Sequence, residues 1–207
     1  YTPYKNPKLS DGPEGEYLTD RLTNETIQFI NDIDQKPFFL FLSFYSVHTP
    51  IQPNIKHIDK FNKKLEQLGI DGTAVREEGK GITTLDQHNA AYASMLFALD
   101  KNIGKLVKNL KERGLYENTT LVFTSDNGGL STLSKSRNRK APTSVLPLRA
   151  GKGWLYEGGI RVPLIAWHPK KIKANTRSDQ IGYFADFLPT IADLAGVDPI
   201  VKVDGVS

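Results

Sequence analysis

Residues 92–129 read YASMLFALDKNIGKLVKNLKERGLYENTTLVFTSDNGG, and this stretch decides the fold class. Its first part predicts one long helix, because apolar residues recur at spacings that keep them on a single stripe. The members of this stripe are Tyr92, Met95, Leu96, Leu99, Ile103, Leu106, Val107 and Leu110. Gly114 predicts the end of the helix. The apolar run Thr119–Thr124 then predicts a buried strand, and a helix that leads into a strand is typical of α/β proteins.

Outward from this unit, two further apolar runs predict strands. Phe38–Phe44 (FFLFLSF) is continuously apolar, as in a strand buried on both faces of a parallel sheet. Arg161–Trp167 (RVPLIAW) is the other, and Pro163 indicates an edge or a strand start. Helices are predicted over Glu16–Ile33, Ile58–Leu68 and Phe184–Ala195, and loops over 69–84 and 125–159.

This alternation predicts an α/β fold with a largely parallel sheet and helices on both of its faces. An average sheet has about five or six strands. Only three strands are predicted here, so we expect the sheet to be incomplete. The first residue is Tyr1 and the only methionine is Met95, so we also expect a longer parent polypeptide.

Composition excludes several classes of protein. The 207 residues are 39% hydrophobic and 24% charged, as in a soluble globular domain. The net charge of +4 is too small to indicate a nucleic-acid-binding protein, and no apolar run approaches the roughly 18 residues of a membrane span. Cysteine is absent, which excludes disulfides, thiolate zinc sites and cysteine nucleophiles.

The segment Ser125–Gly129 (SDNGG) follows the predicted strand at its carboxyl end, where open α/β sheets bind ligands. Asp126 and Asn127 offer hard oxygen donors, which suit Ca²⁺ or Mg²⁺ better than zinc. Taken alone, the same residues are better interpreted as an ordinary Asn-Gly turn, because that dipeptide is a common turn former. Two ligands do not complete a metal site, so further oxygens would have to come from elsewhere.

Two other residues have suitable chemistry for a hydrolytic site. His48, in the loop after the first predicted strand, could protonate a leaving group. Lys152 lies between glycines and offers a point charge for a tetrahedral oxyanion. The basic run of Lys135, Arg137, Arg139 and Lys140 is best interpreted as a solvated loop, with attraction of anionic substrate as the weaker alternative. Together these residues suit metal-assisted hydrolysis of a phosphate or sulfate ester.

Several long motifs, KPFFLFLSFYSVHTP, TSDNGG, GKGWLYEGGIRVP and DFLPTIADLAG, occur in an order that resembles the sulfatase family of the alkaline-phosphatase-like superfamily. The resemblance implies that Asp126 and Asn127 supply two of the four protein ligands of a divalent cation, usually Ca²⁺, with Mg²⁺ as the other candidate. It implies that Lys152 binds the sulfate oxygens. His48 would contact the sulfate ester and protonate or stabilise its leaving oxygen.

The sequence departs from the family at the nucleophile. Sulfatases use a formylglycine made from the first residue of a C/S-x-P-x-R motif, and this chain contains no such motif. In the family that motif and further ligands lie upstream of the segment seen here. We therefore expect residues 1–207 to be a partial catalytic domain, without the nucleophile segment and the C-terminal subdomain.

The parent protein is expected to hydrolyse sulfate esters to sulfate and an alcohol, and the fragment alone is expected to be inactive. A phosphodiesterase or phosphonate hydrolase of the same superfamily, or an inactive binding module, are the alternatives. The expected partner is a sulfated small molecule or glycan, with no nucleic acid and no membrane span. The uncovered sheet edge predicts self-association of the fragment. The family's usual locations are the periplasm, the lysosome and the cell exterior.

Overall fold

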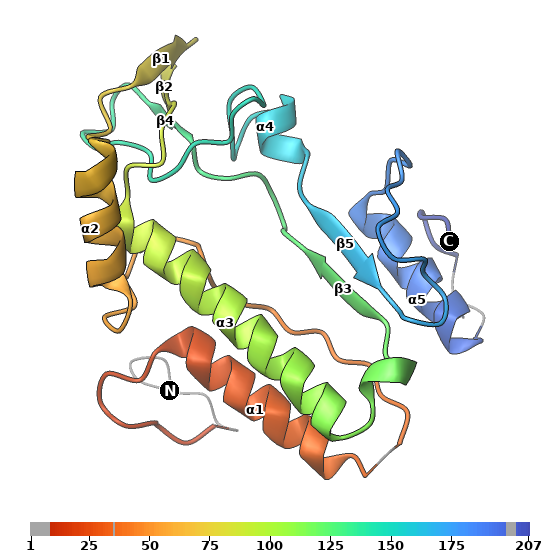
Figure 1. Ribbon diagram of the computed structural model, residues 1–207. Helices are drawn as coiled ribbons and strands as arrows, with labels where there is room; N and C mark the ends of the chain where they lie inside the picture. The colour runs from red at the N-terminus through yellow and green to blue at the C-terminus, as the bar shows by residue number, and fades with distance from the viewer. Residues whose placement is uncertain (1–8, 35, 198–201) are drawn as a thin grey trace. The chain divides into compact units, whose positions relative to one another are not determined.

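The computed structural model describes residues 9–34, 36–197 and 202–207 (Figure 1). The chain forms two compact units, Tyr1–Lys171 and Ile172–Ser207. The first unit contains α1 (Leu18–Asp32), α2 (Ile58–Leu68), β1 (Val75–Glu78), β2 (Gly81–Thr84), α3 (Ala90–Glu112), η1 (Tyr116–Asn118), β3 (Leu121–Thr124), β4 (Thr132–Ser134), α4 (Glu157–Ile160) and β5 (Leu164–Trp167). The second contains η2 (Phe184–Asp186) and α5 (Phe187–Ala195). The α/β class is confirmed.

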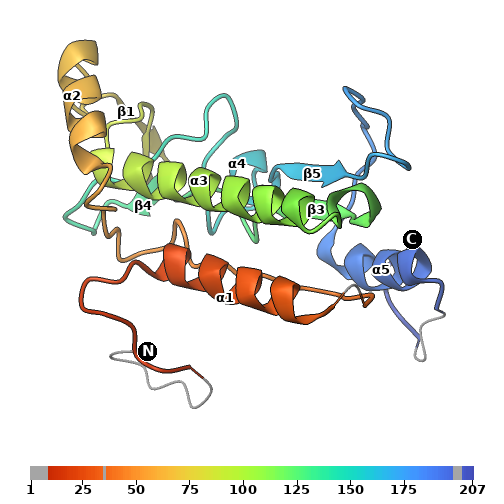
Figure 2. The ribbon, with the colours of Figure 1, turned by 60° about the horizontal axis from the view of Figure 1, so that its bottom comes forward.

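Helices α1 and α3 pack side by side and form the main helical layer of the first unit (Figures 1 and 2). The stripe predicted on α3 supplies buried Tyr92, Met95 and Leu99, although Leu96 is 45% exposed. At the contact, Asn102 Nδ2 donates to Asp20 Oδ1 of α1 at 2.7 Å, and Asn102 is buried. The helices predicted from periodicity are confirmed, although α1 buries threonines beside Ile30 and α2 buries no residue.

A small sheet occupies stretches that the sequence predicted to be loops. β1 pairs antiparallel with β2, and β2 pairs antiparallel with β4. The loop prediction for 69–84 is therefore wrong, as is that for 125–159, which contains β4 and α4. These strands lack the apolar alternation of a half-buried strand. Buried polar side chains hold them instead: Thr83 Oγ1 and Thr132 Oγ1 lie 2.7 Å apart.

The predicted strands Thr119–Thr124 and Arg161–Trp167 correspond to β3 and β5, which pair antiparallel with Thr124 opposite Leu164. Pro163 immediately precedes β5, as expected for a strand start. Burial of the strand faces was predicted wrongly: Val122 is 48% exposed and Ile165 is 59% exposed. All strand pairs among the described residues are antiparallel, so the largely parallel sheet is not confirmed.

The run Phe38–Phe44 was predicted to be a buried strand, and that prediction is wrong for this chain. The segment belongs to no sheet in the described structure, and Phe41 is 83% exposed and Phe39 64% exposed. An apolar run indicates what a segment can bury, but a strand also needs a neighbouring backbone to accept its hydrogen bonds. The described residues provide none for this run.

In the second unit, Asp186 closes the turn before α5. Its carboxylate accepts hydrogen bonds from the backbone N–H groups of Tyr183 and Val206, at 2.9 and 3.0 Å, and these bonds lower its pKa. The helix ends at Gly196, whose φ of 71° is left-handed. The helix prediction for Phe184–Ala195 is confirmed in η2 and α5. Within the described residues, every helix is too short or too polar to cross a bilayer.

Candidate functional site

The turn after β3 carries the predicted acid–amide pair. Ser125 Oγ donates to Asn127 O at 2.9 Å and closes the turn. Asn127 Nδ2 donates to Asp126 Oδ2, so the two side chains lie against each other. Asp126 is exposed and Asn127 is half-buried, which leaves the carboxylate open to a ligand.

Glycine backbones bring this turn against the segment that carries Lys152. Gly128 N donates to Gly159 O at 2.9 Å, and Lys152 N donates to Gly129 O at 2.9 Å. The contact is so close that a Cβ at Gly128 would lie 1.8 Å from Gly158 O. The structure therefore brings together two motifs, at Asp126 and Lys152, that the sequence placed in one predicted site.

Replacing Gly128 by alanine is expected to destabilise the chain by about 3 kcal/mol, the upper part of the usual range for overpacking. The added methyl group meets backbone, which cannot move aside as a side chain would. Gly104→Ala is the matched control, because Gly104 lies on α3 with nothing near its Cβ position, and it should gain up to about 1 kcal/mol. Urea unfolding of both variants measures the difference. Equal stabilities would contradict the close packing.

The oxygen donors of the turn suit a hard divalent cation, but they are few. Asp126 supplies a carboxylate and Asn127 an amide carbonyl, whereas Ca²⁺ takes about six to eight oxygens. Across the described ranges, no group of three or more His, Asp or Glu side chains is arranged to hold a metal ion. The pair therefore fits part of a Ca²⁺ or Mg²⁺ site, and other residues must complete it.

His48 makes contacts with its own loop. Its Nδ1 lies 2.7 Å from Thr49 O, and since a carbonyl oxygen only accepts, Nδ1 carries the proton. Its ring meets Tyr45 edge-on, with centroids 5.8 Å apart. Among the described residues, no hydrogen bond or ring contact joins His48 to Asp126 or Lys152.

The Lys152 segment rests on an ion pair that the sequence did not indicate. Glu78 of β1 is 7% exposed, and its Oε1 accepts hydrogen bonds from Arg149 Nε at 3.0 Å and Arg149 Nη2 at 2.6 Å. The Arg149 guanidinium also lies 3.8 Å from the centre of the Tyr156 ring. Partners 71 residues apart leave no local pattern, so no sequence signal could have found them.

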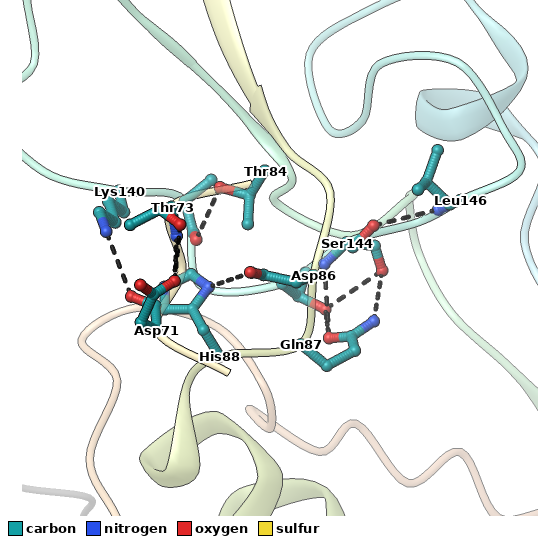
Figure 3. A network of polar contacts seen from close by, with 11 residues as sticks. Asp71, Thr73, Thr84, Asp86, Gln87, His88, Lys140, Ser144 and Leu146 are labelled. Atoms are coloured by element: carbon teal, nitrogen blue, oxygen red, sulfur yellow. Dashed lines mark hydrogen bonds and ion pairs between the residues drawn. The ribbon is translucent and has the colours of Figure 1, made fainter. Parts of the chain in front are cut away.

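A second polar network joins the start of α3 to the loop after β4 (Figure 3). Gln87 Oε1 accepts from Thr143 Oγ1 at 2.8 Å, and Gln87 Nε2 donates to Ser144 O at 2.8 Å. Lys140 Nζ donates to Asp71 O at 3.4 Å in the same network. These bonds fix the end of the basic run Lys135–Lys140 to the rest of the unit.

Acidification should weaken the Glu78–Arg149 contact. Hydrogen bonding from Arg149 holds the pKa of Glu78 below its ordinary value of 4.5, against the opposing effect of burial. A lowered folded-state pKa stabilises the fold above the unfolded pKa, and that stability is lost as pH falls through the folded pKa. The wild-type free energy of unfolding should therefore fall below pH 4.5 more steeply than that of Glu78→Gln. Glu77→Gln, next to it and exposed, is the control, and parallel curves for Glu78→Gln and wild type would contradict the prediction.

The fold and site define an α/β protein in which the turn carrying Asp126 and Asn127 is hydrogen-bonded through its backbone to the glycine-flanked Lys152 segment. The profile of the family described as Sulfatase matches residues 1–197. The chain belongs to the sulfatase family.

Relatives and solved structures agree with this assignment. A protein named sulfatase from Formosa agariphila is 33% identical over 98% of this chain and 34% of its own length. The N-acetylgalactosamine-6-sulfatase of Canis lupus familiaris is 31% identical over 88% of this chain and 30% of its own length. Among solved structures, the crystal structure of Ps i-CgsB in complex with k-i-k-neocarrahexaose resembles this chain with a TM-score of 0.73 and 32% sequence identity. The match covers 96% of this chain and 39% of that one. The chain thus spans about a third of the length of the curated relatives it matches.

Proposed function

We propose that this chain is part of the catalytic domain of a longer sulfatase, which hydrolyses a sulfate ester to sulfate and an alcohol. Family membership and the short span relative to the relatives support the proposal. The observation that most supports it is the hydrogen bond from Lys152 N to Gly129 O, which joins the backbone of the lysine segment to the turn that carries Asp126 and Asn127. An ester sulfate bears its charge on oxygens that such a site would neutralise.

We propose one role for each candidate residue. Lys152 would contact the sulfate oxygens through its ammonium group, and Asp126 and Asn127 would hold Ca²⁺ or Mg²⁺ through their oxygens. When bound, the cation would supply Lewis-acid neutralisation of the sulfate charge. His48 donates from Nδ1 to Thr49 O, so only Nε2 is available to the leaving oxygen. It could protonate that oxygen only from the imidazolium form.

The substrate class we propose is a sulfated glycan. The neocarrahexaose bound in the related crystal structure supports a carbohydrate substrate over a small aryl sulfate. The family's usual locations, the periplasm, lysosome and cell exterior, are the compartments we propose for the parent protein.

Metal binding tests the proposal. Asp126→Ala in the parent protein is expected to abolish measurable Ca²⁺ binding by calorimetry, and with it sulfate ester hydrolysis, while the fold is retained, because Asp126 is exposed at a strand end. Asp100→Ala is the control, since Asp100 is an exposed carboxylate on α3. Unchanged Ca²⁺ and Mg²⁺ affinity in Asp126→Ala would make residues 125–129 an ordinary turn and remove the metal role.

A further inference from the structure

The excess positive charge of the chain is concentrated in one part of the first unit. Residues 71–85 and 134–149, which form the β1–β2 hairpin and the loop after β4, contain seven of the 27 basic and three of the 23 acidic residues. The remainder of the chain then holds 20 of each sign, so the net charge of +4 arises here. In Figure 1 these strands lie together at one end of the unit.

The basic run is exposed, as a solvated loop would be, and its backbone is hydrogen-bonded to the neighbouring hairpin. Lys135 N donates to Lys80 O at 3.0 Å and joins the loop to the hairpin turn. At its other end, Thr84 Oγ1 donates to Ala141 O at 3.2 Å. Between these points Arg137 N donates to Ser134 O at 2.9 Å. This hydrogen bond closes a tight turn and fixes the backbone from which the Arg137 side chain extends.

Three cations on this surface have no counter-charge. The side chains of Lys80, Arg137 and Arg139 are exposed and make no ion pair within the described ranges. The two nearby glutamates are already engaged, Glu77 with Lys135 at 2.8 Å and Glu78 with Arg149. We refer to Lys80, Arg137 and Arg139 as the basic surface. Uncompensated cations at fixed positions attract anions.

Aromatic rings connect the basic surface to the Lys152 segment. Trp154 lies two residues after Lys152, and a Cβ at Gly81 would be 3.2 Å from its ring. Gly81 follows Lys80 directly, so the ring packs beside the hairpin turn. Trp154 stacks on Tyr156, with centroids 6.2 Å apart and an interplanar angle of 16°. Flat aromatic faces beside cations suit a ligand that has both apolar C–H faces and anionic groups, as a sulfated sugar chain has.

We propose that the basic surface and Trp154 bind the neighbouring sulfate groups of a sulfated polysaccharide whose reacting sulfate ester lies at Lys152. This inference rests on the proposed function and adds to it that the substrate is a polymer with several sulfates. Lys80, Arg137 and Arg139 contact non-reacting sulfates, and the Trp154 ring packs against an intervening sugar. Affinity for the polymer then depends on salt, because binding releases the counterions of the polyanion.

Binding of the parent protein to immobilised dextran sulfate tests the proposal, with unmodified dextran as the blank. The triple variant Lys80→Ala/Arg137→Ala/Arg139→Ala should bind at least about tenfold more weakly at low salt, and its affinity should fall less steeply with added salt. The triple variant Lys63→Ala/Lys64→Ala/Lys105→Ala is the matched control. It removes the same charge from exposed positions on α2 and α3 and should bind as wild type does. Arg137→Lys/Arg139→Lys keeps the charge and should retain most of the binding.

Two outcomes would overturn the proposal. One is equal dextran sulfate affinity in wild type and the basic-surface variant. The other is equally tight binding of double-stranded DNA at the same salt concentration, which would indicate a nucleic-acid surface. Release of sulfate from a sulfated polysaccharide by the parent protein, measured separately, tests the proposed function. If wild type lacks that activity but binds dextran sulfate through the basic surface, the proposed function fails and the binding surface stands.

Discussion

Lys152→Ala in the parent protein is expected to lower kcat/KM for a sulfate ester by roughly 10²–10³-fold, or about 3 kcal/mol of transition-state stabilisation. The ammonium group is carried by a backbone that Gly129 and the surrounding glycines hold in place. In the proposed function, a preorganised cation of this kind would stabilise the charge that develops on the sulfate oxygens. The free energy of unfolding should change by less than about 1 kcal/mol, since the side chain is half-buried and makes no ion pair in the described structure.

Two further variants distinguish a catalytic role from a general effect of charge. Lys152→Arg keeps the positive charge but replaces a compact ammonium by a planar fork, so we expect partial activity. Lys170→Ala removes an exposed cation in the same unit and should leave kcat/KM unchanged. Near wild-type kinetics in Lys152→Ala would remove this residue from the mechanism.

The parts of the fold that could be predicted from sequence are those fixed by neighbours along the chain. The helices α1, α2, α3 and α5 follow from apolar spacing and from stops such as Gly196. Strand positions at β3 and β5 were predicted too, but not their pairing, because pairing depends on a distant backbone. β1, β2 and β4 were missed because polar contacts such as Thr83–Thr132 hold them.

In the candidate site, too, the residues predicted from sequence are those that stand in local motifs. Asp126, Asn127 and Lys152 stand in glycine-rich motifs whose backbones must approach something closely, and the structure shows that they approach each other. His48 was singled out by its loop position, and because no described contact joins it to these residues, its place in the site stays a prediction. The Glu78–Arg149 pair was missed because a long-range ion pair has no sequence period.

Exposed apolar side chains bear on how the 207-residue chain behaves by itself. Phe41, Leu164 and Ile165 are 83%, 56% and 59% exposed, on a strand-like run and a strand that lack further partners in the described structure. Uncovered edges and apolar faces of this kind promote association. The isolated chain is therefore expected to self-associate as its concentration rises.

The isolated 207-residue chain should hydrolyse no sulfate ester at a useful rate. Its sequence has no cysteine and no serine that begins S-x-P-x-R, so it lacks the residue from which the family makes its nucleophile. In the roles proposed for them, Lys152 and His48 would only assist an attack made by another group. Metal binding should also be weak. Asp126 and Asn127 supply only two ligand groups and one negative charge, whereas Ca²⁺ takes about six to eight oxygen ligands.

An assay of the purified chain with an aryl sulfate and added Ca²⁺ decides between these expectations and their opposite, with the parent protein as the positive control. Sedimentation measured on the same sample separates loss of activity from aggregation. Turnover at or above about 1 s⁻¹, within the ordinary range of enzymes, would place a nucleophile among these residues. In that case the partial-domain proposal would be wrong.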